Sequence, residues 1–134
     1  MPSYWMLKSE PNTYSFKQME TDQITSWDGV RNYQAQNFMK TMKIGDQAFF
    51  YHSVSDKEIV GIVEIIKEHY MADDPKFGMV DVKFIKPLKN PVTLAMLKSN
   101  PQLKDLLMLK QSRLSVSPVS ESCWLEIMKM SKDS

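Results

Sequence analysis

The sequence predicts an α+β domain in which a small mixed or antiparallel β-barrel is flanked by short helices. Three segments with strand patterns follow one another closely in the middle of the chain, and segments with helical spacing lie toward both ends. A chain of 134 residues can build one hydrophobic core but has little room for a second. We therefore expect residues 1–134 to form a single domain.

The first part of the chain predicts a strand followed by a short helix. Residues 4–8 have the composition of a strand, which stops at the turn of residues 10–12. Ser15, with a glutamine three residues later, matches a capping box and predicts a helix start. Phe16 and Met19 are then expected to face the core.

A second helix is expected after a loop that spans residues 27–32. Gly45 is expected to end this helix. Its apolar residues recur at the i, i+3, i+4 and i+7 positions of one helical face: Ala35, Phe38, Met39 and Met42.

Three strands are predicted next, over residues 47–53, 58–67 and 79–85. The first alternates between two faces, and the second is apolar on both faces, as in a central or barrel strand. The third places Val80 and Val82 on one face.

The last part of the chain predicts helices around one further strand. Thr93 has the residue type of a helix cap, and Pro101 breaks that helix before another helical turn around Leu106. Residues 113–117 are expected to form the final strand, and a closing helix opens at residues 118–120. One side of this helix carries Trp124, Ile127 and Met128.

The sequence lacks the residues that several kinds of catalytic and cofactor chemistry need. His52 and His69 are the only histidines and Cys123 is the only cysteine, so no metal site can be composed at the usual ligand spacing. Four scattered glycines cannot form a glycine-rich phosphate loop, and no nucleophile elbow is present. The sequence therefore predicts a protein without metal or cofactor that is not an enzyme.

The composition also bears on compartment and partners. No apolar run approaches the ~20 residues that span a bilayer, no secretory signal pattern is present, and one cysteine cannot form an internal disulfide. We expect a cytoplasmic protein, or a nuclear one in a eukaryote, that is monomeric and does not contact membranes. The net charge of +1 does not by itself indicate a nucleic-acid partner.

Polar and aromatic residues concentrate in segments 8–11, 27–34 and 49–53, and segment 113–116 is a candidate to join them. In the second, Trp27 offers a ring for stacking, and Asp28, Arg31 and Asn32 surround it with hydrogen-bonding groups that suit a planar heterocycle. An ordinary alternative remains open here. Trp27 would cover the core, the helix would be capped, and Arg31 would pair with Asp28.

Four ordered blocks resemble the EVE domain family. They are Tyr-Trp-Met-Leu-Lys-Ser-Glu-Pro from Tyr4, Trp-Asp-Gly-Val-Arg-Asn-Tyr-Gln-Ala from Trp27, Phe-Tyr-His-Ser from Phe50, and Arg-Leu-Ser-Val-x-Pro-Val from Arg113. The resemblance implies a PUA-like barrel of about five strands with helices around it. It also implies a non-enzymatic reader of methylated or hydroxymethylated cytosine in DNA.

The resemblance further implies roles for particular residues. Trp27 and Tyr51 would form the walls of a base pocket, and Lys8 and Arg31 would meet backbone phosphate. Polar contacts to the base would come from Ser9, Asn32, His52, Ser53 and Arg113. The alternatives are an RNA-binding PUA-like module and a protein that binds a nucleotide or another small planar ligand.

Overall fold

The computed structural model describes residues 3–133, in which helices surround one mixed β-sheet. The predicted α+β class is confirmed. The elements are β1 (Tyr4–Ser9), α1 (Phe16–Asp22), β2 (Ile24–Trp27), α2 (Tyr33–Thr41), β3 (Gln47–His52), β4 (Glu58–Tyr70), β5 (Met79–Thr93), α3 (Leu94–Ser99), the 3-10 helix η1 (Pro101–Leu103), α4 (Leu107–Lys110), β6 (Val116–Val119) and α5 (Glu121–Asp133).

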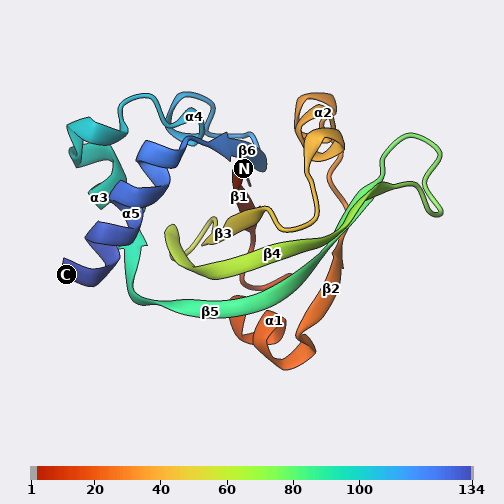
Figure 1. The fold of residues 1–134 in the computed structure, drawn as a ribbon, viewed down its shortest axis with the longest axis horizontal. Coiled ribbons are helices and arrows are strands. Elements are labelled where there is room, and N and C mark those ends of the chain that lie inside the picture. The colour runs from red at the N-terminus through yellow and green to blue at the C-terminus, as the bar shows by residue number, and fades with distance from the viewer. Residues whose placement is uncertain (1–2, 134) are drawn as a thin grey trace.

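One mixed sheet of six strands organises the described chain, in the order β2-β5-β4-β3-β1-β6. Strands β1 and β3 run parallel, whereas the other neighbouring pairs are antiparallel. The long hairpin of β4 and β5 curves across the molecule, with α1 below it and the other labelled helices above it in the view of Figure 1. The sheet is not closed, because β2 and β6 each have one neighbour only. About five strands in a barrel were expected, so the strand number and the closure differ from the prediction.

The additional strand is β2, which the sequence pattern does not indicate. Ile24 and Ser26 are exposed and Thr25 is half-buried, so this strand lacks the apolar alternation that marks a half-buried strand. It lies at the edge of the sheet and pairs only with β5. Trp27, which was expected to begin a loop, is instead the last residue of this strand.

The bounds of β5 and β6 differ most from those predicted, and both strands contain proline. Strand β5 continues past Pro87, which lies opposite Gly61 beside an irregularity in the ladder, where the missing N–H is tolerated. Strand β6 contains Pro118, which is accepted because β6 is an edge strand. Arg113 therefore precedes the strand that was predicted to contain it.

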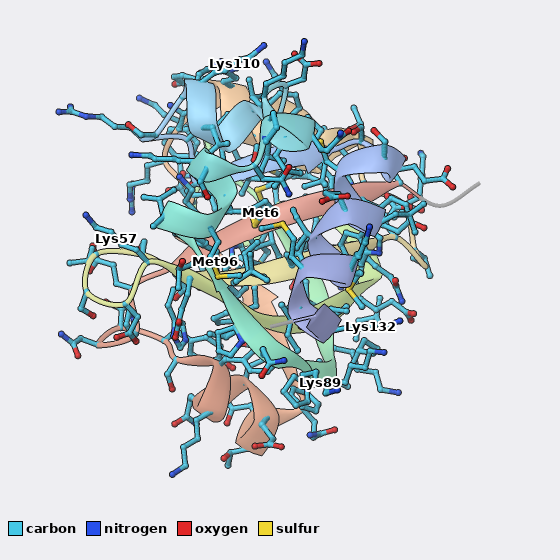
Figure 2. The ribbon with its side chains drawn as sticks, turned by 90° about the vertical axis from the view of Figure 1, so that its left-hand side faces the viewer. Met6, Lys57, Lys89, Met96, Lys110 and Lys132 are labelled. Atoms are coloured by element: carbon cyan, nitrogen blue, oxygen red, sulfur yellow. The ribbon has the colours of Figure 1, made fainter. Side chains whose placement is uncertain are left out.

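Side chains that alternate along the strands divide the core into two clusters on opposite faces of the sheet. In β3, Phe50 belongs to the first cluster, whereas Phe49 and Tyr51 belong to the second. Helices α1 and α2 cover the first cluster and α3, α4 and α5 cover the second. Figure 2 looks onto this second face, where Met6 of β1 lies near the centre.

Local signals for helix starts agree with the structure. The Ser15 hydroxyl accepts a hydrogen bond from the Gln18 N–H at 3.0 Å, and the Thr93 hydroxyl accepts one from the Met96 N–H at 3.1 Å. Phe16 is buried as predicted. Within residues 3–133, no helix is long and apolar enough to cross a membrane.

Candidate functional site

A cavity of about 330 Å³ opens where the end of β1 meets the end of β2. We call it the Trp27 cavity. It is lined by Lys8 and Ser9 of β1, by Thr13 and Tyr14 of the following turn, by residues 25–30, and by Ser115. Segments that are far apart in the sequence thus converge on one small hollow. Its volume lies at the lower end of the range of small-ligand sites, about 300–1,000 Å³.

Trp27 forms a fixed wall of this cavity. Its side chain is 7% exposed, and its ring stands perpendicular to those of Tyr14 and Phe50, with centroids 6.4 and 5.4 Å away. Edge-to-face packing of this kind holds an aromatic ring in one orientation. Within residues 3–133, the indole N–H of Trp27 donates to no protein acceptor, so it remains available to a ligand.

Three polar groups of the cavity are already engaged in holding its shape. The Ser9 hydroxyl donates to the Tyr14 carbonyl at 2.7 Å, and the Tyr14 hydroxyl donates to Asp22 at 2.9 Å. The Ser26 hydroxyl donates to Asp81 at 2.9 Å. Burial, the largest cause, raises the pKa of Tyr14, so its hydroxyl stays protonated at neutral pH.

Three other polar side chains of the cavity have no hydrogen bond or ion pair with the described part of the chain. They are the hydroxyls of Thr13 and Ser115 and the carboxylate of Asp28, all in the lining. Hydroxyls can donate and accept, whereas an ionised carboxylate only accepts. The cavity therefore combines an aromatic wall with unengaged donors and acceptors, which is what recognition of a planar heterocycle requires.

Buried Gln36 holds the loop that follows Trp27. Its amide nitrogen donates to the carbonyl oxygens of Val30 at 2.9 Å and of Gly78 at 3.0 Å. Its amide oxygen accepts from the Gly78 N–H at 3.1 Å and lies 2.9 Å from Nε2 of His69. Burial and the nearby charge of Lys40 lower the pKa of His69, which favours the neutral ring at pH 7. This network connects one rim of the cavity to the β4–β5 loop.

Lys8 lies between the Trp27 cavity and a second hollow. Its ammonium group donates to the Ser112 carbonyl at 2.9 Å and lies 5.7 Å from the centroid of the Tyr51 ring. Burial lowers the pKa of this ammonium group from its ordinary value. The described carboxylates form no ion pair with it.

The second hollow has a volume of about 440 Å³, and we call it the lysine groove. Tyr51 and Ser53 line this groove and not the Trp27 cavity. Tyr51 is 3% exposed and belongs to the core cluster on the face opposite Trp27. The structure therefore does not bring Tyr51 and Trp27 together as two walls of one pocket. The full lining is Lys8, Tyr51, Ser53, Val54, Lys57, Leu94, Lys98, Met108, Leu109 and Ser112.

His52 supports the fold beside the site. Its Nε2 accepts a hydrogen bond from the Phe16 N–H at 3.0 Å, and its Nδ1 lies 3.5 Å from the Asp56 carboxylate. The ring thereby connects the end of β3 to the first residue of α1. His52 lines neither the Trp27 cavity nor the lysine groove.

Asn32 and Arg113 line a third hollow of about 330 Å³. The Asn32 side chain accepts from the Ala35 N–H at 2.8 Å and caps α2, as the ordinary alternative in the sequence analysis supposed. The same alternative paired Arg31 with Asp28. In the structure the Arg31 side chain is 73% exposed, and its guanidinium group lies 3.5 Å from the carboxylate of Asp74 instead. Backbone N–H groups, the largest cause, lower the pKa of Asp74.

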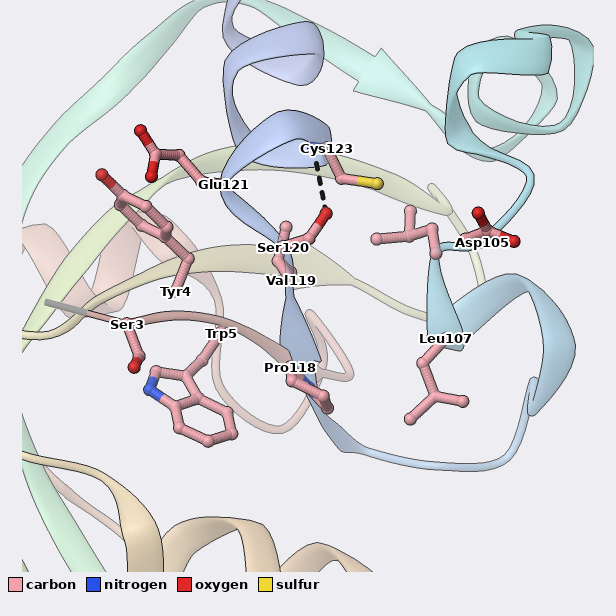
Figure 3. A pocket seen from close by; sticks show the side chains of 11 residues that line it. Ser3, Tyr4, Trp5, Asp105, Leu107, Pro118, Val119, Ser120, Glu121 and Cys123 are labelled. Atoms are coloured by element: carbon pink, nitrogen blue, oxygen red, sulfur yellow. Dashed lines mark hydrogen bonds between the residues drawn. The ribbon is translucent and has the colours of Figure 1, made fainter. Parts of the chain in front are cut away.

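A larger hollow lies elsewhere, beside the start of α5 (Figure 3). This Tyr4 cavity has a volume of about 490 Å³ and contains none of the predicted site residues. The carboxylates of Asp105 and Glu121 line it, and so does the thiol of Cys123. Ser120 caps α5 here by accepting from the Cys123 N–H at 3.2 Å, the contact that Figure 3 marks.

Of the nine predicted residues, the structure groups Lys8, Ser9 and Trp27 in one cavity. The sequence analysis did not include Thr13, Ser115 or Asp28 among the site residues. Asp28 carried a signal, because it follows Trp27 directly in the polar segment. Ser115 carried one too, because it lies in segment 113–116 and in the block that begins at Arg113. Thr13 carried none, since only the folded chain brings the turn after β1 beside the residue before β6.

Comparisons with known proteins agree with this architecture. A family model described as the EVE domain matches residues 3–130. Thymocyte nuclear protein 1 of Homo sapiens is 35% identical to the chain over 158 aligned residues, which cover 90% of this chain and 70% of the relative.

Solved structures are similar over almost the whole chain and confirm the predicted fold class. A protein of Rhodopseudomonas palustris solved by NMR is 47% identical with a TM-score of 0.90, covering 97% of this chain and 93% of its own. A crystal structure of human THYN1 protein in complex with 5-methylcytosine containing DNA is 32% identical with a TM-score of 0.91. That match covers 98% of this chain and 99% of the other.

Proposed function

The chain belongs to the EVE domain family, and from this premise we propose that it binds DNA and captures one modified cytosine in the Trp27 cavity. One observation carries the proposal. The cavity combines the wall of Trp27 with polar side chains, among them Asp28, that have no partner in the described chain. The similarity to human THYN1 in complex with 5-methylcytosine containing DNA supports DNA as the ligand class.

A base must leave the stack of the DNA duplex before it can enter the Trp27 cavity. A cavity of this size is closed to a base inside a duplex, so the base must be flipped out, which costs a few kcal/mol. Contact of the base with an aromatic side chain returns roughly 1–3 kcal/mol. The remaining free energy must come from hydrogen bonds at the base edge and from phosphate contacts outside the cavity.

Asp28 favours cytosine over the other pyrimidine. Cytosine presents an exocyclic amine, N4, as a donor, whereas thymine presents the O4 acceptor at the same position. The carboxylate of Asp28 can only accept, so it pairs with the cytosine amine and repels the thymine oxygen. The hydroxyls of Thr13 and Ser115 can donate to the acceptors on the cytosine edge.

The modification itself contributes a limited share of the affinity. A buried methyl group contributes about 0.8 kcal/mol, which is a factor of about four in affinity. A hydroxymethyl group would gain more if Thr13 or Ser115 lies within hydrogen-bonding reach of it, at about 0.5–1.5 kcal/mol. We propose that the chain reads the base without altering it, since the described residues include no cluster of His, Cys, Asp and Glu of the kind that holds the metal ion of base deaminases.

A binding series tests the function. Duplexes that differ only in one base (cytosine, 5-methylcytosine or 5-hydroxymethylcytosine) are titrated against the protein at several salt concentrations. We expect tighter binding of a modified duplex and a log–log salt slope of about −2 to −4, from about −0.9 per neutralised phosphate. Equal binding of all three duplexes would refute base reading. Preference for RNA of the same sequence, or salt-independent binding of the free nucleotide, would support one of the alternatives.

A further inference from the structure

We propose that the lysine groove binds the sugar–phosphate strand that flanks the captured base, as a second subsite beside the Trp27 cavity. This proposal rests on the proposed function and adds to it the path that the strand takes across the surface. The connection is Lys8, which lines both the Trp27 cavity and the lysine groove. A DNA strand that leaves the Trp27 cavity past Lys8 therefore enters the lysine groove directly.

The charge of the groove is one-sided. Three ammonium groups line it, those of Lys8, Lys57 and Lys98, and its described lining contains no aspartate or glutamate. The ion pairs found within residues 3–133 involve other residues, so these three cations have no carboxylate partner there. Unpaired cations that share a groove attract a polyanion and release its counterions on binding.

The floor of the groove is apolar, which distinguishes it from a scatter of surface lysines. Tyr51, Met108 and Leu109 line the groove together with the lysines, and Tyr51 and Met108 are almost fully buried. A nucleotide complements this groove, because its charged phosphate can meet the lysines while its largely apolar sugar and base faces can pack on the apolar side chains. The groove volume of about 440 Å³ is enough for a part of such a strand.

The rim of the groove is held in an unusual backbone conformation. Between β3 and β4, Val54 and Lys57 both have positive φ angles, 73° and 50°, which non-glycine residues rarely adopt. Backbone hydrogen bonds fix this turn at both ends: the Ser53 N–H donates to the Ser9 carbonyl at 2.9 Å, and the Leu94 N–H donates to the Lys57 carbonyl at 2.8 Å. The turn thus presents Lys57 from a preformed position, which lowers the entropy lost on binding.

Lys8 supports the same conclusion independently. The burial that lowers the pKa of its ammonium group destabilises the charged form, and no described carboxylate compensates for this. A phosphate between Lys8 and the other two lysines would supply the missing counter-charge. The hydrogen bond from Lys8 to the Ser112 carbonyl uses one of its three donors and leaves two for that phosphate.

A charge-matched pair of variants tests the groove. Lys57→Gln/Lys98→Gln removes two exposed cations from the groove, and Lys89→Gln/Lys132→Gln removes two exposed cations from outside it. Figure 2 shows Lys57 on the turn after β3, with Lys89 and Lys132 at the opposite side of the view. We expect the groove variant to bind modified and unmodified duplexes roughly ten-fold more weakly, with a salt slope flatter by about 1.5 to 2 units. The control variant should match the wild type.

The outcomes separate this proposal from the proposed function. If the wild type prefers the modified duplex and the groove variant keeps its affinity and slope, the groove proposal fails and the reader function stands. Equal losses in both variants would show long-range charge in place of contact, which also overturns the groove. If the wild type binds none of the duplexes, the proposed function fails and the groove proposal fails with it.

Oligonucleotides with the modified base at one end or the other add a directional test. In only one of these two oligonucleotides do the flanking phosphates lie on the side of Lys8. The ten-fold loss of affinity caused by Lys57→Gln/Lys98→Gln should therefore appear with that oligonucleotide alone. An effect of equal size with both, or displacement by millimolar inorganic phosphate alone, would show a general anion site and overturn the strand path.

Discussion

The Trp27 cavity and the Tyr4 cavity lie in the same small domain but differ in the groups that their walls offer. The Tyr4 cavity is the larger, at about 490 against 330 Å³, and its charged groups are the carboxylates of Asp105 and Glu121. The Trp27 cavity combines an aromatic wall with unengaged hydroxyls, one carboxylate and the ammonium group of Lys8. The carboxylates would repel a polyanion from the first, whereas in the second the ammonium group of Lys8 offsets the carboxylate of Asp28.

Volume alone therefore does not locate a nucleic-acid site in this domain. The aromatic residues of the Tyr4 cavity are already used, since Tyr4 stacks on Trp124 at 4.4 Å and the Trp5 indole donates to buried Asp46 at 3.0 Å. The Trp27 indole N–H has no hydrogen-bond partner within residues 3–133. What distinguishes the proposed site is therefore the set of groups that folding leaves unengaged.

The largest effect is expected from removing the aromatic wall. Trp27→Ala should lower affinity for the modified duplex by roughly 1–3 kcal/mol, or about 5- to 150-fold, and erase most discrimination against the unmodified one. Trp27→Phe should keep most of both. Titrations with the duplex series measure this. If folded Trp27→Ala keeps full discrimination, the pocket assignment is wrong.

Stability must be measured beside this affinity, because Trp27 is also a core residue. Removing a buried aromatic side chain costs about 3–5 kcal/mol of unfolding free energy. Denaturant titration of Trp27→Ala and Trp27→Phe shows whether each variant is folded under the binding conditions. Phe50 and Tyr14 would lose their edge contacts in the alanine variant, so its Tm is expected to fall as well.

A smaller effect is expected at the acceptor for the cytosine amine. Asp28→Ala should weaken binding of cytosine-containing sites by about 1–2 kcal/mol, roughly ten-fold, with Asp28→Asn in between because it keeps one acceptor. Asp73→Ala removes an exposed carboxylate that lies outside the Trp27 cavity and serves as the control. Equal or tighter binding by Asp28→Ala would exclude the carboxylate from base recognition.

A several-fold effect is expected from pH through Lys8. Because burial lowers the pKa of its ammonium group, Lys8 loses its proton at lower pH than an exposed lysine does. Phosphate binding favours the charged form, so affinity should fall as pH rises toward the ordinary lysine range. Burial raises the pKa of the neighbouring Tyr51 hydroxyl, so its ionisation is shifted to higher pH.

The control for this pH effect is Lys8→Arg, which stays charged throughout that range. Salt-matched titrations between pH 7 and 10 should show a steeper decline for the wild type than for Lys8→Arg. Parallel profiles for the two proteins would mean that Lys8 does not meet phosphate.

The smallest effect is expected in the Tyr4 cavity. Asp105→Asn/Glu121→Gln should change duplex affinity by less than about two-fold, because both side chains are exposed and surface charges are screened beyond about 10 Å at 0.1 M salt. The same duplex titrations measure it. A large gain in affinity would show that these carboxylates face bound DNA, which would move the interface toward this cavity.

The sequence predicted most of the elements, because their signals are local. Helix caps at Ser15 and Thr93 and the apolar spacing of α2 depend on residues within one or two turns. The polar edge strand β2 was not predicted, since its pairing with β5 joins residues more than fifty positions apart. Its short polar pattern looks like a loop until that partner is present.

At the site, the residue pattern predicted the family, the aromatic residue Trp27, the cation Lys8 and the polar segment after Trp27. Which of these residues share a cavity became clear only from the folded chain. Tyr51 was predicted to lie on a strand, and it does. The pairing of β1 with β3 places it beside Lys8, but its ring lies on the sheet face opposite Trp27. The physical reason is that side chains alternate between faces along a strand. Which face lies beside which loop is fixed by long-range pairing, so blocks that are adjacent in a family pattern can belong to two different hollows.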